Sequence, residues 1–96
     1  MIRIVRLELK AENAQLFEAF FAKTKSNIAQ MPGCNGVELY KDADQPHVYY
    51  THSYWDSTED LERYRQSEFF KKTWTYTKSL FQNKAQAFSL VEIAEE

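Results

Sequence analysis

The first ten residues alternate between the two faces of an extended chain, and this period of two is typical of a β-strand. We therefore predict a strand over residues 2–10. Its two faces are different: one carries Arg3, Val5, Leu7 and Leu9, and the other carries Ile2, Ile4, Arg6, Glu8 and Lys10.

After residue 12 the apolar positions recur every three or four residues, which indicates an amphipathic helix of about five turns. Its stripe consists of Phe17, Phe20, Phe21, Thr24, Ile28 and Met31. Asn13 is placed to cap the start of this helix. Pro32 and Gly33 end it, because proline cannot continue a helix and glycine accepts a left-handed turn.

The middle of the chain predicts a hairpin, with strands over residues 36–40 and 48–55 and a polar loop between them. Residues 57–60, Ser-Thr-Glu-Asp, match a capping box, so a helix carrying Leu61 and Tyr64 should begin there. A second helical stretch follows from Ser67, with one stripe formed by Phe70, Trp74, Thr77 and Phe81. Residues 85–93 predict a last strand, and Glu95-Glu96 a frayed acidic end.

The predicted order is β-α-β-β-α-β, which indicates one ferredoxin-like α+β domain over residues 1–96, with an antiparallel sheet. Both helical regions of this fold cover the same face of the sheet. Ile2, Ile4 and half the aromatic residues of the third strand would then face solvent in a monomer. Such a patch usually marks an interface, so we expect a homodimer that pairs two sheet faces.

Charge and cysteine content narrow the class of protein. The formal net charge is −2, which favours neither nucleic acid nor anionic membrane as a partner. Cys34 is the only cysteine and belongs to no metal-binding spacing, so we expect no metal site, a reducing compartment and a cytoplasmic location. No signal-peptide pattern is present, and no apolar run approaches the ~20 residues that span a bilayer.

Aromatic residues make up 16% of the chain, and candidate chemistry lies among them. His52 is a candidate general base, because imidazole titrates near neutral pH. It shares a strand face with Tyr50; these two residues line a pocket if that face meets the helices, and an interface if it meets a partner. Tyr64 and Trp74 are either core residues or donors that orient a flat ligand. Arg3 either reaches round the sheet edge or binds a substrate carboxylate.

Three segments, in the expected order and spacing, resemble the antibiotic biosynthesis monooxygenase (ABM) family of dimeric α+β barrels. MPGCNGVELY (residues 31–40) is similar to the family's PGCxGYEL turn into the second strand. WDSTEDL (residues 55–61) resembles WESxExL, and SEFFK (residues 67–71) resembles SPHF(K/R). The resemblance implies a homodimer, with a small-molecule cavity between the helices and the sheet of each subunit.

Family members include oxygenases that oxidise phenols or quinols without metal or flavin, and also haem-degrading relatives. The resemblance to the latter places Val5, Tyr64 and Trp74 where they carry Asn, Trp and the iron-ligating His, which disfavours haem degradation. Tyr64 and Phe69 stand where many other members carry histidine.

Together, the residues and the resemblance predict a cofactor-independent monooxygenase that acts on a small phenol or quinol. In this hypothesis His52 is catalytic, and the substrate is bound by Tyr64, Trp74, Tyr50 and Phe70. The alternatives are a non-catalytic dimer that binds a small aromatic or apolar molecule and, third, a haem-binding relative.

Overall fold

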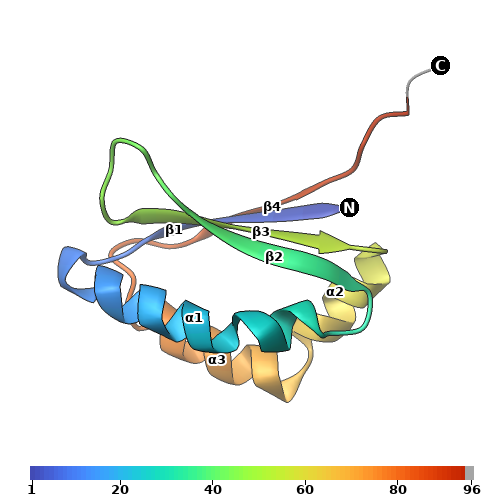
Figure 1. The fold of residues 1–96 in the computed structure, drawn as a ribbon, viewed down its shortest axis with the longest axis horizontal. Coiled ribbons are helices and arrows are strands. Elements are labelled where there is room, and N and C mark those ends of the chain that lie inside the picture. The colour runs from blue at the N-terminus through green and yellow to red at the C-terminus, as the bar shows by residue number, and fades with distance from the viewer. Residues whose placement is uncertain (95–96) are drawn as a thin grey trace.

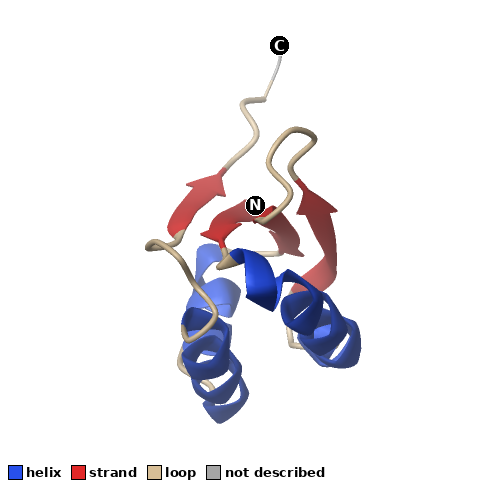
Figure 2. Ribbon diagram, turned by 90° about the vertical axis from the view of Figure 1, so that its left-hand side faces the viewer, coloured by secondary structure: helices blue, strands red, loops and turns tan. Residues whose placement is uncertain are grey.

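A four-stranded antiparallel sheet is covered by helices on one face only (Figures 1 and 2). The structure is a computed structural model and describes residues 1–94; the predicted acidic end, Glu95-Glu96, lies outside the described residues. The strands are β1 (Ile2–Glu8), β2 (Cys34–Lys41), β3 (Val48–Trp55) and β4 (Gln86–Leu90). The helices are α1 (Ala14–Ala29), α2 (Thr58–Arg65) and α3 (Glu68–Lys78), preceded by a short 3-10 turn, η1 (Ala11–Asn13).

The strands lie in the order β2-β3-β1-β4, which confirms the predicted ferredoxin-like α+β fold. The two terminal strands are shorter than the alternation predicts. Ile2 at the start of β1 pairs with Leu90, so residues 91–93 have no neighbouring strand to continue the ladder. At the other end of β1, Leu9 makes an isolated bridge to Phe81, and its N–H donates to the His47 carbonyl (2.9 Å).

The helix caps differ from one another. Asn13 makes no side-chain capping hydrogen bond. Its side-chain amide donates instead to the Leu80 carbonyl (3.3 Å), which ties η1 to the segment after α3. Ser57 does cap α2, because its hydroxyl accepts from the Asp60 amide (3.1 Å). Ser67 caps α3 in the same way, accepting from the Phe70 amide (3.1 Å). These two separate caps divide the second helical region into two helices.

Strand register decides which residues lie under the helices. Thr51 of β3 pairs with Val5 on one side and with Leu39 on the other, and this row faces the helices. The next row, which contains His52 and Ile4, faces away from them.

The core lies between α1 and the centre of the sheet. Its buried cluster consists of Leu7, Leu9, Phe17, Phe21, Val37, Tyr49 and Leu80. The rings of Phe17 and Tyr49 meet edge to face at 5.5 Å, and the Tyr49 hydroxyl donates a hydrogen bond to the Glu18 carboxylate. Trp55, 2% exposed, extends this packing below α2.

The ionisation of Tyr49 makes the stability of the core depend on pH in the alkaline range. Burial, followed by the hydrogen bond to Glu18, raises the pKa of Tyr49 to about 12. The ordinary value is about 10, so the stability contributed by the neutral phenol is fully present below about pH 10 and is lost as the pH rises towards 12. We expect Tyr49→Phe to lower the free energy of unfolding by about 1 kcal/mol at neutral pH and to lose less stability above about pH 10.

Urea unfolding at pH 7 and at alkaline pH measures both effects. Tyr76→Phe is the matched control, because it removes the hydroxyl of a tyrosine that is 39% exposed. Equal alkaline losses in the wild type and Tyr49→Phe would contradict the prediction.

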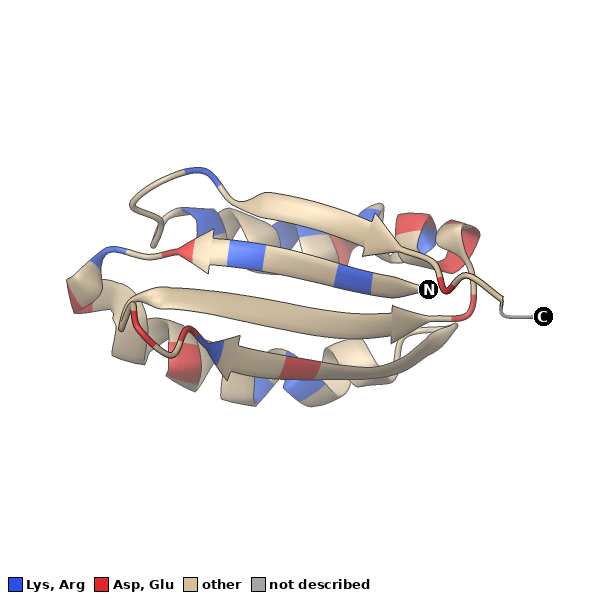
Figure 3. Ribbon diagram, turned by 90° about the horizontal axis from the view of Figure 1, so that it is seen from above, with Lys and Arg blue, Asp and Glu red and all other residues tan. Residues whose placement is uncertain are grey.

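The opposite face of the sheet, hereafter the open face, is bare of helices in the described chain (Figure 3). The charged positions of the sheet lie on β1 and β2, whereas β3 and β4 carry none. Large apolar side chains are exposed here, with Phe88 50%, Leu90 46% and Ile2 36% accessible. Glu38 of β2 accepts hydrogen bonds from the hydroxyls of Tyr54 (2.9 Å) and Tyr40 (3.0 Å), which lower its pKa.

Candidate functional site: a cavity between the helices and the sheet

A cavity of about 330 Å³ lies between the helices and the sheet. This volume is at the lower end of the roughly 300–1,000 Å³ typical of small-molecule sites. All four strands and all three α-helices contribute to its lining.

The sheet side of the cavity is formed by the helix-facing rows of the strands. Val5 and Ala87 are paired neighbours on β1 and β4, and Thr51 and Ser53 come from β3. These side chains are small or β-branched, so they leave room above the sheet. Ser53 also accepts a hydrogen bond from the indole of Trp55 (2.9 Å), which fixes its oxygen.

One wall of the cavity is provided by the apolar stripe of α1. Phe20 and Thr24 line it one turn apart. The ring of Phe20 packs on that of Tyr76 in α3, with the ring centroids 4.5 Å apart. Helices α1 and α3 therefore make an aromatic contact across the helical layer.

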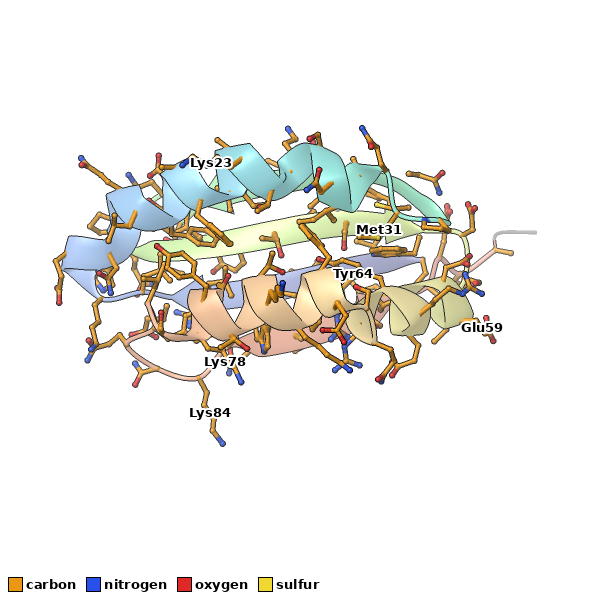
Figure 4. All side chains as sticks on the ribbon, turned by 90° about the horizontal axis from the view of Figure 1, so that it is seen from below. Lys23, Met31, Glu59, Tyr64, Lys78 and Lys84 are labelled. Carbon is orange, nitrogen blue, oxygen red and sulfur yellow. The ribbon has the colours of Figure 1, made fainter. Side chains whose placement is uncertain are left out.

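The other wall is a continuous row of aromatic rings along α2 and α3. Tyr64 stacks on Trp55 with ring centroids 5.1 Å apart, and it meets Phe70 edge-on at 5.0 Å. Phe70 stacks on Trp74 at 5.9 Å, and Trp74 contacts Phe81 at 5.6 Å. Figure 4 shows Tyr64 on the side of α2 that faces α1. Each ring therefore holds its neighbour, and the wall presents a firm aromatic surface.

Two hydrogen-bond donors on this wall have no protein partner. Among the described residues, neither the hydroxyl of Tyr64 nor the indole N–H of Trp74 makes a hydrogen bond, although both residues line the cavity. Burial, followed by the nearby Cys34, raises the pKa of Tyr64 well above its ordinary value. Tyr64 is therefore a neutral phenol at physiological pH, able to donate to a ligand rather than to act as a base.

Two cationic side chains line the same cavity. Arg3 comes from β1, and Arg65 is the last residue of α2. Burial, followed by the positive charge of Arg65, lowers the pKa of Arg3. The two guanidinium groups therefore repel one another, although both stay charged at neutral pH.

The structure brings three of the five predicted site residues together. Tyr64, Trp74 and Phe70 all line the cavity. His52 and Tyr50 do not, because their strand face is the open one. The rings of His52 and Tyr40 meet edge to face at 5.0 Å, so this histidine is part of the polar group around Glu38.

Sequence reasoning missed several lining residues. Arg65 follows Leu61 by four positions and Tyr64 by one, and helical spacing could have placed all three on one stripe. Thr51 and Ser53 could not be found in this way. Both faces of β3 carry aromatic residues, so its composition does not say which face meets the helices.

The arrangement of potential metal ligands bears on the haem and metal alternatives. Within residues 1–94, no three histidine, cysteine, aspartate or glutamate side chains lie close enough together to bind one metal ion. The cavity positions compared with the haem-degrading relatives hold Val5, Tyr64 and Trp74, none of which is an imidazole.

None of the described helices is both long and apolar enough to cross a membrane.

The fold and the cavity together define a ferredoxin-like α+β domain with a cavity beneath its helices. The family model described as "Antibiotic biosynthesis monooxygenase" matches residues 1–75, and the chain belongs to this family. The resemblance carried by residues 31–40, 55–61 and 67–71 is thereby confirmed. No curated protein matches the chain significantly.

Solved structures share the fold at low sequence identity. Rv0793 from Mycobacterium tuberculosis has a TM-score of 0.87 at 17% identity, covering 98% of this chain and 95% of that one. PA3566 from Pseudomonas aeruginosa has a TM-score of 0.83 at 22% identity, covering 97% and 93%. A crystal structure described as an antibiotic biosynthesis monooxygenase has a TM-score of 0.87 at 14% identity, covering 98% and 100%. At these identities the likeness establishes the fold alone.

Proposed function

We propose that this protein is a cofactor-independent monooxygenase that oxidises a small phenol or quinol in the cavity between its helices and sheet. The observation that carries this proposal is the lining of the cavity. Rows of aromatic rings form a slot suited to a flat molecule, and the unpaired donors of Tyr64 and Trp74 can orient its oxygen atoms. Membership of the monooxygenase family supports the same reaction class.

The reaction needs no external reductant. A quinol that reacts with O₂ gives a hydroxyquinone and water: one oxygen atom forms a new carbon–oxygen bond, and the other leaves as water. The substrate itself supplies all the electrons and the two hydrogen atoms of that water. What remains for the protein is to exclude solvent, hold the ring and favour the electron-rich ionised form of the substrate.

The cavity carries out these tasks with few polar groups. Phe70 and Trp74 present parallel rings, 13° apart, against which a flat substrate can stack. The Tyr64 hydroxyl is held by ring contacts on both sides, so it can donate a hydrogen bond from a fixed position. Because no histidine, aspartate or glutamate among the described residues lines the cavity, the substrate's own hydroxyl must release its proton to water.

That missing base also favours a second candidate function, a non-catalytic domain that binds a small aromatic molecule. Both functions predict binding, and only the first predicts consumption of oxygen. Measuring O₂ uptake by the metal-free protein with a panel of dihydroxyaromatic compounds separates them. Uptake above the uncatalysed rate supports the oxygenase, whereas binding without uptake supports the binding domain.

Filling the cavity tests its role in either function. Thr24 lines the cavity from α1, and Thr24→Trp places a large ring in that space. We expect calorimetry to show at least a tenfold loss in affinity for 2-naphthol, because the ligand and the new ring compete for one volume. Lys23→Trp adds the same ring next to it, on the outer side of α1 (Figure 4), and should bind like the wild type. Equal affinity of both variants would place the ligand elsewhere.

We also propose that two copies of the chain form a homodimer through their open faces. The exposed Phe88, Leu90 and Ile2 support this pairing, because a soluble monomer rarely leaves so much apolar surface uncovered on one sheet. The dimer keeps the helices, and therefore the cavities, on the outside of the pair.

A further inference from the structure

Arg3 and Arg65 both line the cavity, and their charges lie close enough to interact. Arg3 lies on the helix-facing side of β1, between Ser53 and Ser89 of the neighbouring strands. Arg65 ends α2, directly after Tyr64. Apart from these two arginines and the neutral phenol of Tyr64, the cavity-lining residues carry no titratable group.

The positive charge of these two arginines is only partly compensated. Arg65 pairs with Glu62 (3.1 Å), but both side chains are largely exposed and Glu62 does not line the cavity. Such a surface pair is weak, so the guanidinium of Arg65 is free to take a better partner. Within residues 1–94, Arg3 has no carboxylate within ion-pair distance; its one side-chain hydrogen bond goes to the Ser89 hydroxyl (2.9 Å).

Arg3 is partly buried, and the protein satisfies few of its donors. A guanidinium group has five N–H donors, and only one of those of Arg3 meets a described side chain. Partial burial and the charge of Arg65 both disfavour the Arg3 cation, and the charge of Glu62 offsets them only in part, because the pKa of Arg3 is lowered. An anion bound at this place would relieve both.

We propose that the cavity selects aromatic molecules that carry a carboxylate, with Arg3 and Arg65 holding the carboxylate and the aromatic wall holding the ring. This inference rests on the proposed function, because it assigns a substrate class to the same cavity. Carboxylate matches the planar, paired donors of guanidinium better than a single phenolic oxygen does. The substrate class is therefore a phenol or quinol that bears a carboxylate.

The test compares two probes that share a ring and differ in charge. We expect calorimetry at pH 7 to show that 2-naphthoate binds the wild-type protein at least tenfold more tightly than its neutral counterpart, 2-naphthamide. Arg3→Gln and Arg65→Gln should each weaken naphthoate binding by roughly 10- to 100-fold. The same variants should bind naphthamide unchanged, which also reports that they are folded.

Arg63→Gln is the matched control. Arg63 is on the same helix, pairs with Asp60 and lies outside the cavity lining, so its loss should leave both affinities unaltered. Arg3→Lys should recover part of the naphthoate affinity, because it restores the charge without the paired donors.

The outcomes separate this inference from the function on which it rests. Equal affinities of naphthoate and naphthamide, or an equal loss of both in Arg3→Gln, would overturn the carboxylate site and leave an aromatic-binding cavity. If neither probe binds the wild-type protein, cavity binding itself fails, and the carboxylate site fails with it.

Discussion

Ile4→Asp on the open face is expected to convert the proposed homodimer to a monomer. Ile4 lies at the centre of β1, where it pairs with His52 on one side and with Phe88 on the other. A carboxylate at this position would be buried against the partner sheet, and Arg6 on the same face is already paired with Glu8. Such a burial costs several kcal/mol, so the dissociation constant of the dimer should rise by at least about 100-fold. Sedimentation velocity over a range of concentrations measures the change.

Leu16→Asp provides the matched control. Leu16 is on α1 and is already 53% exposed, so a carboxylate there stays in water and the variant should sediment like the wild type. The prediction is wrong if Ile4→Asp sediments as the wild type does. A wild-type chain that remains monomeric at high concentration would remove the proposed dimer altogether.

Gly33→Ala is expected to be the most destabilising single-atom change in the turn between α1 and β2. Gly33 has a φ of +81°, which side chains other than glycine rarely adopt. A Cβ atom here would also collide with the carboxyl group of Asp60. That carboxyl accepts a hydrogen bond from the Ser57 hydroxyl (2.9 Å) and pairs with Arg63, so moving it disturbs the start of α2. We expect a loss on the order of 2–4 kcal/mol in the free energy of unfolding.

Gly36→Ala separates the two causes. Gly36 also has a positive φ (+144°), but a Cβ there meets only one ring atom of Tyr54, at 4.0 Å. Its substitution therefore brings the backbone strain without the collision, and urea unfolding should show a clearly smaller loss. If the two variants are equally destabilised, the contact with Asp60 contributes nothing.

The fold was predictable because its signals are local and agree with one another. Alternation over β1 placed Val5 and Leu7 on the face that is covered, and the Ser57 cap marked the start of α2. The ends of β1 and β4 were not predictable in this way. The length of a strand depends on where its neighbours stop, and that is a property of the assembled sheet.

The site was only partly predictable. Tyr64, Trp74 and Phe70 followed from helical spacing and from the family resemblance, and all three line the cavity. His52 and Tyr50 were expected in the pocket only if their strand face met the helices, and the register turns that face away. Arg65 went unnoticed because a single cation at a helix end is usually solvated, and only its proximity to Arg3 gives it significance.

The placement of the two tryptophans gives the protein a built-in optical reporter. Trp55 is 2% exposed and is not among the residues that line the cavity, so a ligand does not contact its indole, whereas Trp74 lines the cavity. A molecule that enters should therefore change the emission of Trp74 and leave that of Trp55 as an internal reference. Occupancy can then be followed in the unlabelled chain by its intrinsic fluorescence.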